Sequence, residues 1–475
     1  MNPWTASHNR ACALFLLCCI SYLPALSSFY VKDDIALLTS ANFSIKNALW
    51  HSWPGGFFRP SSELLLSVQY SIFGLSPIPY HIVSLAAHIG TCFFVHRLFN
   101  LLPKYRSSSF LATAIFALHP LNTESVSWIS GQMSLFAALL AVATLYLLCT
   151  RKSPAASTLT CTIGLGFYEN FLLVPVLWIT ISATYRPLLN SLRPLSLLPI
   201  VMISGIYAYW RFSILGLGGG YYNVDLSIKT SAINGLYYLY LLMGGSAIGG
   251  RIIHYAPDTI HLNFLTVFPP LLLANLAIFL AFIQRKKNKL MQLSIGYMLP
   301  ILWVAIALMT AFILPERPRR LGYLAAPGFA LALAMAIWSI LGSTRIQPAI
   351  IRVAIAAYLI SSSYTLFDRN SDWKKAGQLE ESLSSTISPD CQTVVVDMPN
   401  LLGDALIFNS ISTAQWLRID GQHTELAVYA PFEWERDQHA ATPDCYYRYS
   451  NSQIIKVSVS NSPSRFTRGA NWATH

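Results

Sequence analysis

The sequence predicts an all-α polytopic membrane protein of about 11 transmembrane helices, with a small α/β domain at its C-terminal end. Of its 475 residues, 54% are hydrophobic and only 11% are charged, whereas soluble domains usually carry about 25% charged residues. The mean hydropathy is +0.47. Apolar stretches of roughly 15–25 residues, long enough to span a bilayer, recur as far as residue 366, and the chain becomes more polar after it.

Eleven apolar stretches qualify as candidate spans. They cover residues 11–29, 79–101, 107–120, 127–149, 156–169, 171–185, 195–212, 262–283, 291–314, 321–342 and 348–366. The first stretch, which follows Arg10 and ends in PALSS, could instead be a signal peptide. Residues 156–185 could also form one span, with 231–250 as an extra one. We favour the broken span, because Glu169 interrupts it and a carboxylate is costly in hydrocarbon.

The loop cations orient this bundle. With the N-terminus in the cytoplasm, every second loop lies on the cytoplasmic side, and the cations of these loops are therefore placed as the positive-inside rule requires. They are Arg97, Lys104, Arg106, Arg151, Lys152, Arg186, Arg193, Arg285, Lys286, Lys287, Lys289 and Arg345. This placement explains the net charge of +11 without a nucleic-acid partner, and the chain has no zinc-finger spacing, Walker A loop or dinucleotide GxGxxG. The expected surroundings are a lipid bilayer, with the C-terminus on the outer side.

Carboxylates from separate loops collect on the outer face in this topology. The first outer loop holds adjacent Asp33 and Asp34, and the short turn HPLNTESVSW holds His119 and Glu124. A carboxylate that accepts the proton of an attacking hydroxyl is a general base. Two or three such carboxylates could also hold a divalent ion, either Mg²⁺ or Mn²⁺, with Asp34 and Glu124 as candidate ligands.

Three arginines lie on the same outer face, against the orientation rule. The segment PERPRRLGY contains Arg317, Arg319 and Arg320. A fixed anionic partner such as phosphate would explain them, because guanidinium groups match phosphate geometry; contact with lipid headgroups is the alternative. Carboxylates and arginines beside an apolar bundle suit the displacement of a lipid phosphate from a sugar, in which cations stabilise the leaving group.

Several stretches resemble a known family. The segment FFRPSSELLLSVQYSIFGLSPIPYH, the segment ALHPLNTESVSWISGQ, the segment PERPRRLGYLAAPGF and the run RNSDW are similar to motifs of the transmembrane and TPR-containing O-mannosyltransferases and their bacterial relatives. The resemblance covers roughly residues 12–385. It implies a type C (GT-C) glycosyltransferase fold, an outward-facing active site and a polyprenyl-phosphate sugar donor of undecaprenyl or dolichyl type.

The resemblance also implies roles for individual residues. Asp33 and Asp34 match an acidic pair in which one member is the catalytic base, and we favour Asp33. Glu124 matches a second acidic position that coordinates metal or positions the acceptor. The substrate-binding candidates are Arg59, His119, Glu169, Arg317, Arg319, Arg320 and Tyr323. A His-Pro at a helix end is more often structural, so His119 is either a substrate-binding residue or a structural one.

The chain departs from the family pattern in three ways. Tyr168–Glu169 stands where the family has Lys-Glu, and the loop over residues 221–259 keeps only a faint likeness to the family. No 34-residue TPR period follows residue 366. We divide the chain into a transmembrane domain, residues 1–369, and an extracytoplasmic α/β domain, residues 370–475. Cys391 and Cys445 of the second domain could form a disulfide.

The predicted function is therefore an inverting transfer of a mannose-like hexose to a hydroxyl of a protein, glycan or lipid. Undecaprenyl carriers would place the enzyme in a bacterial inner membrane with a periplasmic site, and dolichyl carriers in the endoplasmic reticulum with a luminal site. A polyprenyl-linked glycan ligase is the alternative that the outer arginines favour. A transporter would instead show charges near the bilayer midplane and an inverted repeat.

Overall fold

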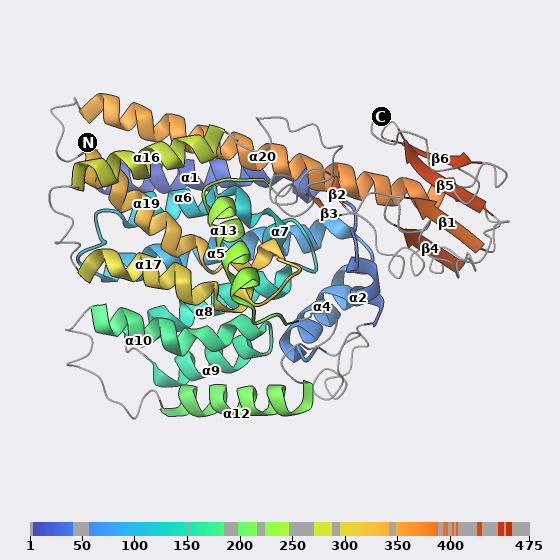
Figure 1. Cartoon of the computed structure of the whole chain (residues 1–475), viewed down its shortest axis with the longest axis horizontal. Coiled ribbons are helices and arrows are strands. Elements are labelled where there is room, and N and C mark those ends of the chain that lie inside the picture. Colours follow the sequence, from blue (N-terminus) through green and yellow to red (C-terminus); the bar gives the residue numbers. More distant parts are fainter. Residues whose placement is uncertain are drawn as a thin grey trace.

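The chain forms a bundle of helices with a small group of strands at its C-terminal end (Figure 1). The computed structural model describes residues 3–40, 57–150, 153–184, 198–215, 224–246, 270–286, 295–341, 348–387, 393–397, 401–402, 405–406, 425–429, 445–450 and 453–457. The described part is mostly helical, which confirms the predicted fold class.

Helices in the first half of the chain carry the first seven predicted apolar stretches. They are α1 (Pro3–Leu26), α2 (Asp34–Ser40), α4 (Pro60–Phe73), α5 (Pro77–Leu101), α6 (Ser109–Ala117), η1 (Pro120–Asn122), α7 (Thr123–Val126), α8 (Gln132–Thr150), α9 (Pro154–Leu165), η2 (Glu169–Leu173), α10 (Val174–Thr184) and α12 (Leu198–Leu215).

The second half continues the bundle and includes a helix that the sequence placed in an outer loop, α13. Its helices are α13 (Ile228–Leu242), α16 (Pro270–Lys286), α17 (Ile295–Ala307), α18 (Met309–Phe312), η5 (Arg319–Gly322), α19 (Ala326–Leu341) and α20 (Pro348–Thr386).

Three helices are long and apolar enough to cross a membrane by themselves, within the described ranges. The candidate spans are Asn9–Leu26, Pro77–Leu101 and Gln132–Thr150. Shorter apolar helices lie beside them, including Leu271–Leu280 and Ala326–Ile340. The count of eleven crossings and their orientation stay predictions.

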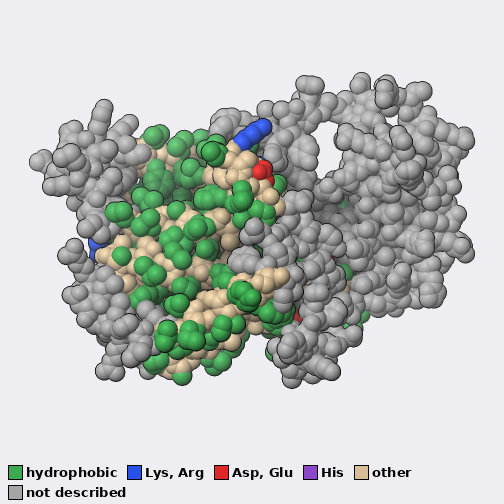
Figure 2. Space-filling model, turned by 60° about the horizontal axis from the view of Figure 1, so that its bottom comes forward, with side chains coloured by type: hydrophobic (Ala, Val, Ile, Leu, Met, Phe, Trp, Pro, Cys, Tyr) green, Lys and Arg blue, Asp and Glu red, His purple; other side chains and the backbone are tan. Residues whose placement is uncertain are grey.

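Hydrophobic side chains cover much of the outer surface of the bundle. On α1, Leu16, Ile20 and Leu23 are 58%, 54% and 59% exposed, and Figure 2 shows a face on which green hydrophobic side chains predominate among the described residues. An apolar surface of this extent is unfavourable in water and indicates contact with lipid.

The chain breaks between α9 and α10 instead of continuing as one long helix. Gly166 follows the end of α9, and η2 starts three residues later at Glu169. A Cβ at Gly164 would lie 2.0 Å from the ring of Phe171, so only glycine lets η2 fold back against α9. The break that the sequence favoured at Glu169 is therefore present.

The first and last helices of the bundle pack along each other (Figure 1). Small polar residues make this contact: the hydroxyls of Ser21 and Ser363 are 2.7 Å apart, and the Asn370 side-chain amide donates to the Ser21 carbonyl at 2.7 Å. Small side chains let helix backbones approach closely in apolar surroundings. α20 is one continuous helix of 39 residues, so it passes through the predicted domain boundary at residue 369 without interruption.

Strands follow α20 in the C-terminal region. They are β1 (Thr393–Asp397), β2 (Leu401–Leu402), β3 (Ala405–Leu406), β4 (Glu425–Tyr429), β5 (Cys445–Ser450) and β6 (Gln453–Val457). β1 lies between β4 and β5 and runs parallel to both, while β6 pairs antiparallel with β5. Cys445 forms a disulfide; its predicted partner, Cys391, lies outside the described residues. The two-domain division stays a prediction.

Candidate active site

Loops from distant parts of the chain meet beside α20. The segment after α1 carries the two aspartates, η1 and α7 carry His119 and Glu124, and η5 carries two of the arginines. η1 contacts both η5 and α20, and α7 contacts η5 and α20. The sequence predicted that these segments share one face, and the structure brings them together.

Asp34 is a buried carboxylate at the start of α2. Its Oδ1 accepts hydrogen bonds from the Ser130 amide at 2.8 Å and the Ser130 hydroxyl at 2.6 Å, and its Oδ2 accepts from the Val31 amide at 3.0 Å. Burial raises the pKa of Asp34 to about 7; the Ser130 and Val31 bonds offset part of this effect, and the charge of Asp33 adds to it. Both oxygens of Asp34 are therefore engaged inside the protein.

Asp33 differs from its neighbour. The side chain is half-buried, and its Oδ1 is buried yet accepts no hydrogen bond from any residue that the structure describes. A carboxylate oxygen without a donor is costly to bury, so this oxygen calls for a donor outside the described residues. Of the two aspartates, Asp33 is the one whose Oδ1 is unbonded within the described part of the chain.

Glu124 binds two of the outer arginines. Its Oε2 accepts from the Arg319 amide and from Arg319 Nε, both at 3.2 Å, and its Oε1 accepts from Arg320 Nη1 at 2.8 Å. Burial alone would raise the pKa of Glu124, but the charges of Arg320 and Arg319 together hold it below its ordinary value. Glu124 is thus an ionised anchor for both guanidinium groups.

Trp128 joins the aspartate loop to the arginine pair. Its indole N–H donates to the Val31 carbonyl at 3.3 Å. The Lys32 ammonium lies 5.4 Å from its ring centroid and the Arg320 guanidinium carbon 5.2 Å, both within cation–π range. Lys32, which precedes Asp33 in the chain, and Arg320, which is held by Glu124, therefore meet at one indole ring.

Arg317 has a different environment from the other two arginines. Its Nε donates to the side-chain oxygen of Asn234 on α13, and its guanidinium carbon lies 5.9 Å from the ring centroid of Tyr237. The backbone at Arg317 is left-handed, with φ 50. The three arginines that the sequence grouped thus divide between two partners.

Arg59 and Glu169 form a second charged centre. Arg59 Nη2 lies 3.1 Å from Glu169 Oε2, and its guanidinium carbon is 4.4 Å from the ring centroids of both Phe57 and Tyr168. Arg211 of α12 adds a second cation, with its Nε 3.6 Å from Glu169 Oε1. The sequence analysis missed Arg211, although a cation inside the predicted span 195–212 was a signal that could have identified it.

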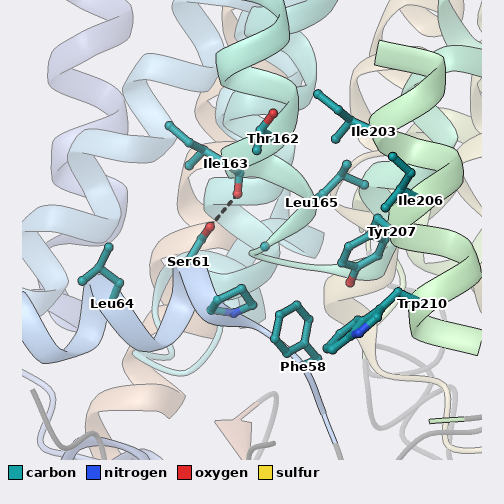
Figure 3. Close-up of a pocket in the computed structure, with 12 residues that line it drawn as sticks. Phe58, Ser61, Leu64, Thr162, Ile163, Leu165, Ile203, Ile206, Tyr207 and Trp210 are labelled. Atoms are coloured by element: carbon teal, nitrogen blue, oxygen red, sulfur yellow. Dashed lines mark hydrogen bonds between the residues drawn. The ribbon is translucent and has the colours of Figure 1, made fainter. Parts of the chain in front are cut away.

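An apolar pocket of about 430 Å³ lies beside this second centre, between α4, α9 and α12. In Figure 3 the rings of Phe58 and Trp210 lie together at its lower edge, 4.1 Å apart between centroids. Tyr207 lines the pocket, and its buried hydroxyl makes no hydrogen bond with the described residues. The lining contains no charged residue, so the pocket is apolar apart from a few polar groups such as the Tyr207 hydroxyl.

Two predicted substrate-binding residues make their hydrogen bonds inside the bundle. His119 Nδ1 accepts from the Leu121 amide at 3.1 Å, and its Nε2 lies 2.8 Å from the Leu242 carbonyl. The Tyr323 hydroxyl lies 2.6 Å from His88 Nδ1 and is buried with the ring. Both ring nitrogens of His119 are thus used internally, which corresponds to the structural interpretation of the His-Pro motif.

The candidate metal ligands are already occupied by protein groups. Among the described residues there is no group of three or more His, Cys, Asp or Glu side chains close enough to hold an ion. Asp34 is bonded to Ser130 and Val31, and Glu124 to two arginines, so their oxygens do not form an open coordination site.

The buried Asp34 predicts a dependence of stability on pH. Its pKa of about 7 in the folded state exceeds its ordinary value of 3.8, so between these values the folded chain holds a proton that the unfolded chain has lost. Its contribution to stability is complete below about pH 4 and is lost as the pH rises to about 7. We expect about 3 kcal/mol of loss between about pH 5 and pH 8, and a smaller loss in Asp34→Asn. The free energy of unfolding in detergent is measured against pH for the parent and for Asp34→Asn. Equal slopes of this free energy with pH in the two proteins would contradict the prediction.

The chain is similar to protein O-mannosyl-transferases. Tmtc1 of Drosophila melanogaster is 29% identical over 148 residues, which are 28% of this chain and 17% of that protein. TMTC2 of Mus musculus is 25% identical over 162 residues, 30% of this chain and 19% of that protein. TMTC2 of Homo sapiens is 22% identical over 229 residues, 41% and 27% of the two chains. These matches confirm the resemblance seen in the motifs, and they span less than a third of each relative.

The structure has distant neighbours among solved proteins. ArnT from Cupriavidus metallidurans in the apo state aligns with a TM-score of 0.46 and 11% identity, over 89% of this chain and 86% of that one. The same protein bound to undecaprenyl phosphate aligns with a TM-score of 0.43 and 11% identity, over 88% and 85%. No protein-family model matches the chain. At these TM-scores no residue of this chain is assigned by comparison with ArnT.

Proposed function

We propose that the chain is a membrane glycosyltransferase that moves a hexose from a polyprenyl-phosphate carrier to an acceptor hydroxyl on the extracytoplasmic face, with inversion. The observation that carries the proposal is the buried Oδ1 of Asp33, which accepts no hydrogen bond from the described residues and follows the turn whose Lys32 shares the Trp128 ring with Arg320. The relatives named above are O-mannosyl-transferases, which supports a mannose-like sugar.

Asp33 is the general base of the proposed reaction. Its carboxylate accepts the proton of the acceptor hydroxyl while the acceptor oxygen bonds to the anomeric carbon. The bond from that carbon to the phosphate oxygen breaks, and the polyprenyl phosphate leaves with the electron pair. A single displacement of this kind inverts the anomeric centre. Lys32 and Arg320 lie where they stabilise the negative charge that grows on the phosphate.

The lipid part of the donor has a matching surface. The pocket between α4, α9 and α12 is apolar along its wall, and Tyr207 marks its polar end beside the buried guanidinium groups of Arg59 and Arg211. An isoprenoid chain suits the apolar wall, while the phosphate that it carries lies with Lys32 and Arg320. We therefore assign the start of the polyprenyl chain to this pocket.

A panel of donors tests the function. Purified protein in lipid nanodiscs is given undecaprenyl- and dolichyl-phosphate hexoses, with peptide, glycan and lipid acceptors, and products are identified by mass spectrometry. We expect transfer from a mannose-like donor, with the inverted anomer seen by NMR, and none with Asp33→Asn. Absence of transfer from every monophosphate donor, with turnover of a diphosphate-linked glycan, would favour the ligase instead.

A bulky side chain in the pocket tests the placement of the lipid chain. Ile206 lines the pocket and Met202 lies one helical turn away on α12; both are exposed, at 64% and 54%. Ile206→Trp fills the pocket, whereas Met202→Trp adds the same bulk outside it. We expect Ile206→Trp to raise the KM for the donor about tenfold, which corresponds to about 1.4 kcal/mol of lost contact, with kcat unchanged. Equal KM values in the two variants would show that the lipid chain does not bind in this pocket.

A further inference from the structure

The C-terminal half of α20 lies directly against the segment that carries Asp33 and Asp34. Four of its residues occur at spacings of three and four, which places them on one helix face: Asn370, Trp373, Gly377 and Glu380. All four are buried. In Figure 1 this part of α20 extends beyond the bundle towards the C-terminal strands, and it contacts β2, β3 and β6.

The backbones touch at Gly377. A Cβ there would lie 2.5 Å from the Phe29 amide nitrogen and 2.9 Å from the Phe29 carbonyl oxygen. One turn earlier, the Ser28 hydroxyl donates to the Trp373 carbonyl at 2.9 Å. Because the neighbouring atoms belong to the backbone, a side chain at residue 377 would push the aspartate segment away from α20.

Glu380 makes the next contact along the same face. Its Oε2 accepts a hydrogen bond from the Lys32 amide at 3.1 Å. Lys32 has a left-handed backbone, with φ 55, a conformation that is unfavourable for residues other than glycine and persists only where surrounding contacts enforce it. The residue that follows this strained turn is Asp33.

Trp128 contacts the same turn. Its indole donates to the Val31 carbonyl at 3.3 Å, its ring faces the Lys32 ammonium, and it stacks on Trp373 with 6.5 Å between centroids. The turn over residues 31–33 is therefore fixed between Trp128 and the buried face of α20.

We infer that Glu380 is a positioning residue for the transfer: it holds Lys32 in the left-handed turn that points the Asp33 carboxylate at the acceptor hydroxyl. This inference rests on the proposed function. Glu380 acts through the backbone of Lys32 and touches no substrate. Since a small misplacement of a catalytic group lowers the rate strongly, losing this contact reduces kcat and leaves the contacts of the lipid chain in the α4–α9–α12 pocket unchanged.

Neighbouring residues of α20 provide matched variants. Glu380 is buried and Glu381 is exposed, as Gly377 is buried and Gln378 exposed. We expect Glu380→Ala and Gly377→Ala to lower kcat by about 10-fold to 100-fold with KM for the donor unchanged. Glu381→Ala and Gln378→Ala keep the parent kcat. Glu380→Gln retains an oxygen that accepts the Lys32 amide, so it restores most of the rate. A kcat of Glu380→Ala equal to that of Glu381→Ala overturns the inference.

Hydrogen–deuterium exchange separates this inference from the proposed function. Glu380→Ala is expected to increase amide exchange over residues 29–36, and Glu381→Ala is not, whether or not a donor has been found. Unchanged exchange in Glu380→Ala overturns the inference. A parent protein that transfers no sugar overturns the proposed function alone, and the exchange result then decides whether Glu380 fixes the turn. A drop in kcat that Glu380→Gln does not restore also counts against the inference.

Discussion

Replacing Asp33 with asparagine is expected to lower kcat for hexose transfer by about a hundredfold to ten-thousandfold, the range that general base catalysis supplies. The amide has nearly the shape of the carboxylate but cannot take the proton of the acceptor hydroxyl. Because Oδ1 of Asp33 accepts no hydrogen bond from any described residue, the exchange removes no hydrogen bond at this oxygen. The unfolding temperature should therefore stay close to that of the parent, while the single-turnover rate falls.

Asp34→Asn is the matched comparison for this prediction. Asp34 accepts three hydrogen bonds, from Ser130 and Val31. An asparagine oxygen can keep the Ser130 bonds, but its amide group faces the Val31 N–H as donor to donor. We expect a shift in stability and a smaller loss of kcat than in Asp33→Asn. If Asp34→Asn abolishes transfer and Asp33→Asn does not, Asp34 is the base and the assignment made here is wrong.

Removing the Glu124 carboxylate is expected to cause the largest loss of stability. Glu124→Ala leaves the buried guanidinium of Arg319 and the nearly buried one of Arg320 without their shared anion. Breaking a buried ion pair from one side costs about 3–5 kcal/mol, because the remaining charge stays desolvated. Chemical unfolding in detergent measures this cost, and transfer should also fall, since Arg320 then loses its position over Trp128.

A double-mutant cycle distinguishes this ion pair from general damage to the fold. Glu124→Gln and Arg320→Gln are made singly and together, and their unfolding free energies are compared. We expect the double variant to be less destabilised than the sum of the single variants, because neither charge is then left alone. Additive losses would show that Glu124 and Arg320 do not stabilise each other.

The comparison between sequence and structure is most informative at the charged residues. The outer-face motifs indicated that Asp33, Asp34, Glu124, Arg319 and Arg320 belong to one site, because carboxylates and arginines in outer loops have few other uses in an apolar chain. The structure bonds Glu124 to Arg319 and Arg320 and brings Arg320 and Lys32, the neighbour of Asp33, to the ring of Trp128. It also separates Arg59 and Glu169 into a second centre with Arg211, an arrangement that the loop positions did not indicate.

The sequence by itself determined the helical bundle, the break at Glu169 and the identity of the charged outer loops. Each of these follows from local composition, since apolar length, a carboxylate within a span and turn residues are all properties of short segments. The apolar stretches of the sequence correspond to helices α1 to α20, with α13 as an addition.

Only the tertiary structure decided what each charged group does. The partners of Asp34, Glu124 and Lys32 lie 96, 195 and 348 residues away in the chain. A hydrogen bond over such a separation depends on how helices pack, and no local pattern encodes it. For this reason the fold could distinguish the bonded Asp34 from Asp33, whose Oδ1 is unbonded among the described residues, place His119 and Tyr323 in the interior, and connect α20 to the turn before Asp33.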